Sequence, residues 1–509
     1  MNRSLFTNKV LFTLTITFLF SFSQLFAQVD KNELDTYIQQ KVKDYDIAGL
    51  SIAIVKDGKV DFEKAYGFAN KEEKNALETD AVFGIASLSK AFTAAAIGIL
   101  VDEGKLNWND KVSKYIEAFE LSDSYVTNNI TVADLLAHRS GYDTFDGDLL
   151  WYGTNYSRKE IVRRFAKYPM SFGFRENYGY QNIMFIIAGE IVEKVSGMTW
   201  DNFIKARIFE PLEMNSSFTE IDKIPKEQLI AYPHVKGDLD ELRSYHNSGG
   251  AAAITSNVLD LSNWLKMWLN NGFFEGDTIL HPITIRNITN LQTPIPPSDF
   301  DLSNGIDFKG YGLGWFVMNY HGSKVAHHGG GLPGYISKIF FFPEINLGAV
   351  ILTNQESSLP TALMYQIIDM YKEKPVREDW AELYLNFSNN YESRTLKKQE
   401  ERLAKREKKA VANIQRDQLI GRYTDKVYGD AQIEIKNGEL IFTMLPSKEI
   451  FTSPMKHWHY NTYQIKFKDK FLPEGYLTFS TNADGKVIGL KVDLPNPDFH
   501  FYKLDFIKK

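Results

Sequence analysis

The distribution of apolar residues divides the chain into a long mixed part and a shorter part with strand patterns alone. Apolar runs over 48–55 and 60–68 flank an Asp-Gly turn, which predicts a hairpin. Residues 87–104 are apolar on nearly every side, which predicts a buried helix. Helical and loop-like patterns follow over about 105–280. Strand patterns return over 312–318, 338–342 and 348–353. We therefore expect an α+β fold in which helices separate strands that join one sheet.

Two further segments complete the predicted organisation. Residues 376–412 are dense in Lys, Arg and Glu, which is typical of a solvated linker helix. Its apolar positions recur seven residues apart, at Leu396, Leu403 and Ala410. Beyond this linker, short alternating runs are separated by Asn-Gly and Asp-Gly turns, which predicts a small all-β domain over 413–509. The predicted α+β domain accordingly spans residues 28–375.

The N-terminal residues 1–27 have the features of an export signal. Arg3 and Lys9 flank or precede an apolar run over 10–22, and Ala27 ends a plausible cleavage site. The run is shorter than the roughly 20 residues that a spanning helix needs. No later run is long and apolar enough to span a membrane. The sequence therefore predicts a cleaved signal peptide and a periplasmic or extracellular protein without a transmembrane segment in the mature chain.

Charge and composition exclude several classes of function. The chain has 58 Lys and Arg against 64 Asp and Glu, a formal net charge of −6, and no basic stripe. We therefore expect no nucleic-acid partner. Because the chain has no cysteine, thiol catalysis, disulfides and thiolate metal sites are excluded. We also expect neither a metal nor an organic cofactor.

The predicted buried helix begins with a Ser-x-x-Lys pattern. Ser87 and Lys90 are three residues apart and therefore share one helix face. Burial lowers the pKa of a lysine, and a neutral lysine can accept the proton of a serine hydroxyl. A second Ser-x-x-Lys pattern at 453–456 opens no helical pattern. The buried helix therefore singles out Ser87 as the candidate nucleophile.

Two later stretches carry residue types that would complement this pair. Tyr180 and Asn182 come just before another predicted helix. A tyrosine can transfer protons, and an asparagine amide can bind a substrate carbonyl. The glycine-rich run at 327–334 would let a strand edge approach a ligand closely. Such an edge would supply one N–H of an oxyanion hole, and the backbone of Ser87 would supply the other.

Together these elements resemble the serine β-lactamase and penicillin-binding protein superfamily, in particular its class C β-lactamase-like branch. The order Ser-x-x-Lys, Tyr-x-Asn and then a basic residue before a glycine-rich strand matches the family pattern. The sequence LLAHRSG at 135–141 and YGLGW at 311–315 match further family segments. The β-rich part is similar to a domain of unknown function found behind such hydrolases. The resemblance implies an antiparallel sheet flanked by helices, with an inserted helical region.

The resemblance also implies a role for each residue of the proton-transfer group. Ser87 would attack a carbonyl and form an acyl-enzyme, while Lys90 and Tyr180 move the protons. Asn182 would bind the substrate amide.

The remaining implied roles fall on the glycine-rich strand. Gly331, next to Gly330, would supply the second N–H of the oxyanion hole. His328 would take the position of the family lysine that faces the carboxylate of a β-lactam or a peptide. Because histidine is mostly neutral at pH 7, it attracts an anion less than lysine does. This departure ranks lactam hydrolysis below other acyl transfer.

Several functions remain compatible with these residues. The leading one is an exported serine hydrolase acting on D-amino-acid peptides, cell-wall-derived peptidoglycan stems or small esters. Alternatives are a β-lactamase or DD-peptidase, and a catalytically silent sensor of the penicillin-binding type. A Ser-His-Asp enzyme of the α/β-hydrolase class would need a Gly-x-Ser-x-Gly elbow, which neither Ser87 nor Ser140 has.

Overall fold

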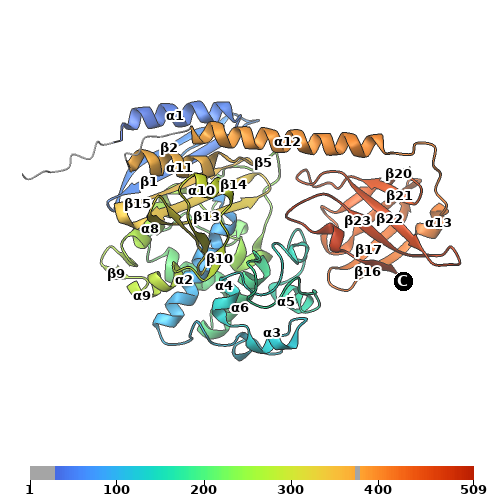
Figure 1. The fold of residues 1–509 in the computed structure, drawn as a ribbon, viewed down its shortest axis with the longest axis horizontal. Helices are drawn as coiled ribbons and strands as arrows, with labels where there is room; N and C mark the ends of the chain where they lie inside the picture. The colour runs from blue at the N-terminus through green and yellow to red at the C-terminus, as the bar shows by residue number, and fades with distance from the viewer. Residues whose placement is uncertain (1–28, 373–378) are drawn as a thin grey trace, which may run out of the picture.

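The computed structural model describes residues 29–372 and 379–509, so the predicted signal peptide lies outside the described residues. The chain forms a larger body of strands and helices and a smaller β-rich body, joined by a long helix (Figure 1). This arrangement confirms the expected α+β class with a β-rich C-terminal region. Within the described ranges, every helix is too short or too polar to span a bilayer.

The sheet of the larger body is antiparallel throughout and draws strands from both ends of that body. Its order is β10-β11-β12-β13-β14-β15-β1-β2-β3. Leu50 pairs with Thr353, so the first strand lies beside the last. The strands are β1 (Gly49–Lys56), β2 (Lys59–Asn70), β3 (Asn75–Ala76), β10 (Thr293–Ile295), β11 (Lys309–Tyr311), β12 (Phe316–Tyr320), β13 (Ser323–Leu332), β14 (Tyr335–Phe342) and β15 (Leu347–Thr353).

Helices cover both faces of this sheet. Successive strand residues point to opposite faces, so Ile52 and Ala53 enter two different cores. One core is completed by α1 (Lys31–Asp44) and α11 (Leu359–Tyr371), and the other by α2 (Ser89–Asp102) and α8 (Val258–Leu269). The other helices of this body are α3 (Ser124–Asn129), α4 (Val132–Leu136), α5 (Arg158–Phe165), α6 (Asn182–Ser196), α7 (Trp200–Ile204), α9 (Pro282–Ile288) and α10 (Asp299–Ser303).

The strand predicted over 312–318 is wrong in its first half. Strand β11 ends at Tyr311, a turn follows, and β12 begins at Phe316. Gly314 in this turn has a φ of +83°, and a Cβ there would lie 2.9 Å from the carbonyl oxygen of Lys90. The glycine therefore lets the turn pack directly against α2. The run looked like a strand because its large residues are buried.

The second sheet also has nine antiparallel strands, in the order β19-β18-β17-β16-β24-β23-β22-β21-β20. They are β16 (Gly421–Asp425), β17 (Gly429–Lys436), β18 (Glu439–Met444), β19 (Thr452–Pro454), β20 (Lys456–His459), β21 (Thr462–Ile465), β22 (Gly475–Thr481), β23 (Val487–Asp493) and β24 (Phe506–Lys508). A short helix, α13 (Arg416–Leu419), precedes them. Three two-stranded pairs lie in the larger body: β4 (Phe83–Gly84) with β7 (Thr255–Ser256), β5 (His234–Val235) with β6 (Asp238–Leu239), and β8 (Phe273–Phe274) with β9 (Asp277–Thr278).

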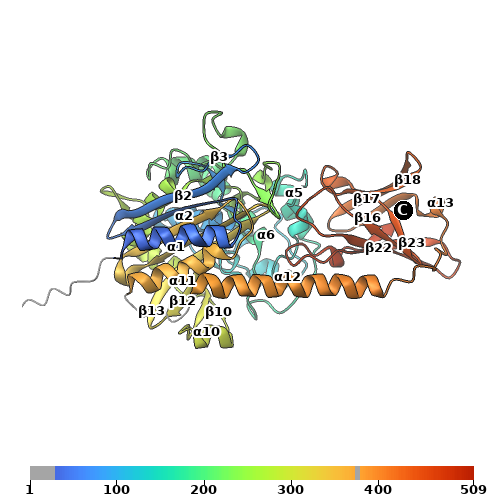
Figure 2. The same cartoon turned by 90° about the horizontal axis from the view of Figure 1, so that it is seen from above.

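The joining helix α12 (Trp380–Ala404) runs from the larger body toward the second sheet (Figure 2). Its first residue, Trp380, is buried and stacks on Tyr365 with 4.6 Å between ring centroids. Leu396 and Leu403 of the expected apolar stripe are 53% and 55% exposed. The helix is therefore fixed at its start and solvated over its middle, and near its end Arg402 pairs with Asp493 and lies over the Tyr476 ring of the second sheet.

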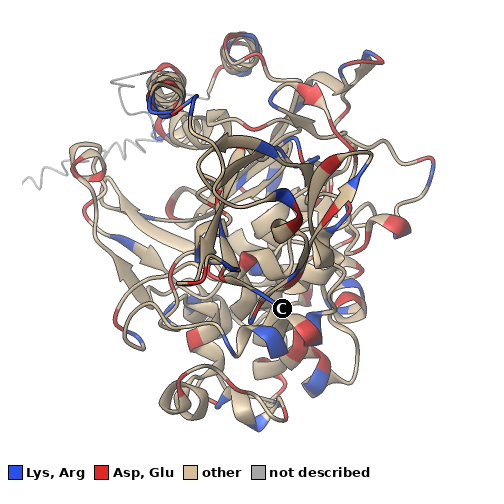
Figure 3. Cartoon of the chain, turned by 90° about the vertical axis from the view of Figure 1, so that its right-hand side faces the viewer, with Lys and Arg blue, Asp and Glu red and all other residues tan. Residues whose placement is uncertain are grey.

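The two bodies also contact each other directly, away from α12. The Tyr152 hydroxyl donates to Asp469 at 2.6 Å, and the Tyr156 hydroxyl donates to the carbonyl of Tyr428 at 2.8 Å. On the end of the molecule formed by the smaller body, described Lys and Arg positions alternate with Asp and Glu positions (Figure 3). Hydrogen bonds from buried and half-buried tyrosines thus join the two bodies.

Candidate active site

The candidate nucleophile lies in a single tight turn between a short strand and the buried helix. Ser87 belongs to a 3₁₀ turn, Ala86–Leu88, and regular α-helix begins only at Ser89. Ala86 has a φ of +53°, a conformation that side-chain-bearing residues rarely adopt. The Ser89 hydroxyl donates to the carbonyl of Ala86 at 2.7 Å and so supports the turn. The turn directs the half-buried Ser87 into a cavity of about 660 Å³.

Lys90 is completely buried behind this serine. Its Nζ donates to Ser87 Oγ at 3.1 Å, to Asn182 Oδ1 at 2.5 Å and to the carbonyl of Ala251 at 2.9 Å. Burial lowers the pKa of Lys90 to about 7, although the carboxylate of Asp148 opposes this shift. A substantial fraction of Lys90 is therefore neutral near pH 7. In that form its lone pair can accept the proton of Ser87.

Asp148 is a site residue that sequence reasoning missed. Its Oδ2 accepts a 2.6 Å hydrogen bond from Nδ2 of Asn182, whose Oδ1 contacts Lys90. Burial raises the pKa of Asp148 to about 8. The contacts thus form a chain from Ser87 through Lys90 and Asn182 to Asp148. Asp148 begins a short 3₁₀ turn, Asp148–Leu150, and has no spacing relation to the other site residues, so no sequence signal pointed to it.

Tyr180 covers the other side of the Lys90 ammonium. Nζ of Lys90 lies 4.8 Å from the centroid of the Tyr180 ring. Burial raises the pKa of Tyr180 well above its ordinary value, and interaction with the Ser87 hydroxyl only partly offsets this. The phenol therefore stays protonated and can pass a proton on. It is not a phenolate base.

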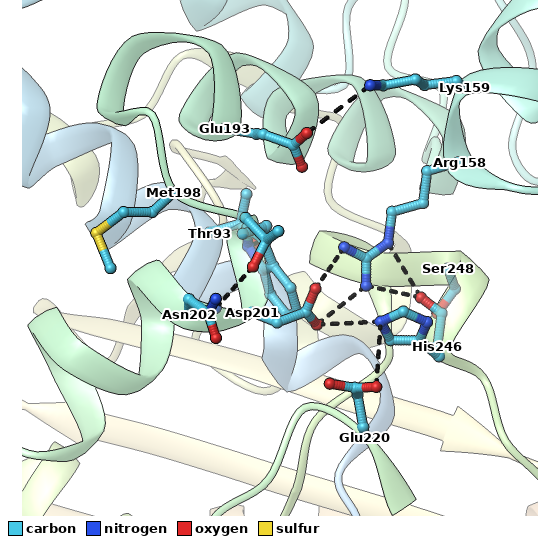
Figure 4. A network of polar contacts seen from close by, with 12 residues as sticks. Thr93, Arg158, Lys159, Glu193, Met198, Asp201, Asn202, Glu220, His246 and Ser248 are labelled. Atoms are coloured by element: carbon cyan, nitrogen blue, oxygen red, sulfur yellow. Dashed lines mark hydrogen bonds and ion pairs between the residues drawn. The ribbon is translucent and has the colours of Figure 1, made fainter.

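The segment behind Lys90 is anchored by a separate polar network (Figure 4). Arg158 forms an ion pair with Asp201 at 2.8 Å and donates to the carbonyl of His246. Thr93 of α2 donates to the carbonyl of Gly250 at 2.8 Å. These contacts fix both ends of 246–251, which supplies the Ala251 carbonyl to Lys90.

The glycine-rich strand β13 presents a free backbone edge to the Ser87 turn. Its pairing with β12 extends only as far as His327. Beyond it, a Cβ placed on Gly330 would lie 2.9 Å from the backbone nitrogen of Ser87 and 2.6 Å from the carbonyl oxygen of Ile85. Gly331 is exposed, and a Cβ there would meet only Ile336 at 3.5 Å. The close approach of strand β13 to the Ser87 turn therefore requires glycine at 330. That the N–H of Gly331 serves as an oxyanion donor stays a prediction.

His328 lines the cavity, but both of its ring nitrogens contact the protein. Nδ1 lies 2.6 Å from the carbonyl of Gly329, and Nε2 lies 2.8 Å from the Tyr311 hydroxyl. A carbonyl can only accept, so Nδ1 carries the proton and Nε2 accepts from Tyr311. Burial lowers the pKa of His328 to about 3. His328 is therefore neutral and does not supply the positive charge that the family lysine would.

Lys338 on the neighbouring strand β14 places a cationic group in the same cavity. It pairs with Gly329, and its Nζ donates to Nδ1 of His327 at 3.2 Å. Burial lowers the pKa of Lys338 to about 8. A lysine inside an apolar strand was a signal that the sequence offered, but the strand register was needed to place it here.

We expect kcat/KM for a small ester to rise with pH through about 7 to 8. Lys90 and Asp148, with pKa values of about 7 and 8, lose their protons in this range, and only neutral Lys90 is a base. With the ordinary lysine pKa of 10.5 the rise would lie far higher. In Asp148→Asn, the loss of the negative charge lowers the pKa of Lys90, so the rise moves to lower pH. Hydrolysis of p-nitrophenyl acetate over a pH series measures the rise for the natural chain and for Asp148→Asn. A rise at higher pH in Asp148→Asn would contradict the charge interaction between Asp148 and Lys90.

Comparison with known proteins places these features in a family. The family model described as Beta-lactamase matches residues 34–366, and a domain of unknown function, DUF3471, matches residues 405–508. The unguisins hydrolase ungD' of Aspergillus campestris is 30% identical over 382 residues, which cover 71% of this chain and 68% of that protein. Protein flp of Staphylococcus aureus is 28% identical over 337 residues, 64% of each chain.

A solved structure shares the fold. The octameric penicillin-binding protein homologue from Pyrococcus abyssi aligns with a TM-score of 0.62 and 23% identity, and the match covers 94% of this chain and all of that one. The antiparallel sheet, the flanking helices and the β-rich C-terminal region are thus a known arrangement. On the family match over most of its length, the chain belongs to the Beta-lactamase family, within the serine β-lactamase and penicillin-binding protein superfamily.

Proposed function

We propose that the chain is an exported serine hydrolase that cleaves a peptide, ester or amide through an acyl-enzyme. The observation that carries this proposal is the 3.1 Å contact between Ser87 Oγ and the buried Nζ of Lys90. The names of two curated relatives, both unguisins hydrolases, support a hydrolase. Export is supported by the signal-like residues 1–27. The division into 28–375, a linker over 376–412 and 413–509 is part of the proposal, and the two separate family matches, over 34–366 and 405–508, support a chain of two domains.

The proposed reaction uses the contacts already described. Neutral Lys90 takes the proton from Ser87, and Oγ bonds to the substrate carbonyl carbon. The resulting oxyanion accepts hydrogen bonds from the backbone N–H groups of Ser87 and Gly331. When the bond to the leaving group breaks, Tyr180 or Lys90 returns the proton to that group. Water then attacks the acyl-enzyme and releases the acid, with the same groups exchanging protons in reverse.

A second candidate is a β-lactamase or DD-peptidase. Lys338 favours it, because a buried cation in the cavity can attract the carboxylate of a β-lactam or of a peptide C-terminus. The catalytically silent sensor is the remaining alternative, and the Ser87–Lys90 contact argues against it.

Covalent labelling tests the proposal. The protein is incubated with a fluorophosphonate and, separately, with a penicillin, and its intact mass is measured. We expect a fluorophosphonate adduct on the natural chain that Ser87→Ala abolishes. Ser453→Ala, in the second Ser-x-x-Lys pattern, should label normally because the Ser453 hydroxyl is buried and bonded to the carbonyl of Pro454.

The penicillin sample separates the candidates. A lasting penicillin adduct favours a DD-peptidase, and rapid penicillin turnover favours a β-lactamase. Labelling by the fluorophosphonate alone favours the esterase or peptidase. If neither reagent modifies the natural chain, Ser87 is not an activated nucleophile. The hypothesis of a catalytically silent sensor then replaces the hydrolase proposal.

A further inference from the structure

The cavity in front of Ser87 is lined in part by residues of the smaller, β-rich body. Phe471, Asp498 and Phe499 line the same space of about 660 Å³ as Ser87 and Asn182. Asp498 and Phe499 follow strand β23 in the loop 494–500, which reaches back toward the larger body. A substrate that enters the site therefore meets side chains from both bodies.

Aromatic packing fixes this loop in place. The Phe499 ring stacks on Tyr152 with centroids 4.0 Å apart and meets Trp151 edge-on at 6.0 Å. Phe499 is 4% exposed. The Tyr152 hydroxyl in turn donates to the completely buried Asp469 of the smaller body. Because Trp151 lines the cavity and follows shortly after Asp148, the loop is positioned by the same segment that carries a site residue.

Charged groups anchor the loop on its other side. His500 and Lys503 of the smaller body both contact the completely buried carboxylate of Asp146, His500 at 3.1 Å. Burial would raise the pKa of Asp146, but hydrogen bonds from His500, Lys503 and Ser171 and the charge of Lys503 outweigh it and hold this pKa at about 2. A buried ion pair of this kind is costly to open on one side only. The residues that directly follow Asp498 are thus held against the larger body.

The three carboxylates that line the cavity differ in their partners. Asp148 accepts from Asn182, and Glu356 accepts from the backbone N–H of Gly334 at 2.7 Å. The carboxylate of Asp498 has no hydrogen-bond or ion-pair partner among the described residues. Both Asp148 and Asp498 line the same cavity. Burial raises the pKa of Asp498, which the charge of His500 only partly offsets, and the negative charge of Asp498 in turn raises the pKa of Asp148.

We propose that Asp498 binds the free ammonium group of the substrate's acyl portion, with Phe471 and Phe499 contacting its apolar side chain. A half-buried carboxylate without a partner gains most from a ligand that donates charge-assisted hydrogen bonds. Aromatic rings beside it stabilise the same cation and bury apolar surface. The β-rich body thereby makes the site specific for amino-acyl substrates. This inference rests on the proposed hydrolase function.

Competitive inhibition measures how strongly the site prefers a free ammonium group over an acetylated one. Turnover of p-nitrophenyl acetate by the full mature chain is followed with phenylalaninamide or N-acetylphenylalaninamide added, in both enantiomers. At pH 7 most of an α-amino group with a pKa of about 8 is charged. We expect at least one enantiomer of phenylalaninamide to bind about tenfold or more tightly than its acetylated form. Asp498→Asn should reduce this ratio of inhibition constants about tenfold.

A matched control variant and the ester turnover itself distinguish failure of this inference from failure of the proposed hydrolase function. Asp484→Asn changes an exposed carboxylate in a turn of the same body and should leave the ratio as in the natural chain. Equal binding of both amides by the natural chain, or an unchanged ratio in Asp498→Asn, would overturn the inference while ester turnover continues. Absence of Ser87-dependent turnover would overturn the hydrolase function itself, and the inference with it.

Discussion

Replacing Lys90 with methionine is expected to lower kcat/KM for a small ester by about 10²–10⁴-fold, the usual contribution of a general base. Methionine matches the length of the lysine stem and suits a site that is completely buried. It removes the only amine in contact with Ser87 among the described residues. The loss should appear mainly in kcat and in the rate of fluorophosphonate labelling, because the substrate does not need Lys90 for binding.

Two measurements separate this loss from unfolding. Lys324 is also substantially buried and donates to Thr289, far from the serine, so Lys324→Met is the matched control and should keep kcat/KM within about twofold. Thermal unfolding of Lys90→Met reports the cost of leaving Asn182 Oδ1 and the Ala251 carbonyl without their donor. Labelling of Lys90→Met at the natural rate would refute the assignment of Lys90 as the base and turn attention to Tyr180.

The Gly330→Ala variant is expected to lose about 10²–10³ in kcat, as when one oxyanion donor is removed. The new Cβ would lie 2.4 Å from Ser337 Oγ, 2.6 Å from the Ile85 carbonyl and 2.9 Å from the backbone nitrogen of Ser87. Two of these atoms belong to backbone that cannot rotate away. Strand β13 and the Ser87 turn must therefore separate by a few tenths of an ångström or more, which misplaces the two N–H groups.

The neighbouring glycine provides the comparison. In Gly331→Ala the Cβ meets only Ile336 at 3.5 Å, and the backbone N–H is retained. This variant should lose no more than about tenfold, with the loss in KM rather than kcat, because the added methyl group borders the substrate and not the turn. The kcat and KM of each variant, measured together with its thermal unfolding, show whether Gly330 is needed to space strand β13 and the Ser87 turn. Equal losses in kcat would mean that Gly330 has no special role in spacing the two segments.

Local patterns predicted most of the elements and part of the site. Side-chain periodicity acts within a few residues. It predicted the hairpin over 48–68, the buried helix after Ser87 and the alternating C-terminal strands. The spacing of Ser87 and Lys90 belongs to the same class, and the structure brings these two into contact. Asn182 and Tyr180 needed the resemblance to a family, because nothing local ties them to Ser87.

The sequence by itself therefore determined most of the elements, their order and the serine–lysine pair. Only the tertiary structure decided what surrounds that pair. Asp148 joins it through Asn182, and Lys338 reaches the cavity only through the strand register. Asp498 comes to the cavity from the other body, hundreds of positions along the chain. Such contacts depend on packing between distant segments and on burial, which shift pKa values and leave charges unpaired; no local periodicity carries that information.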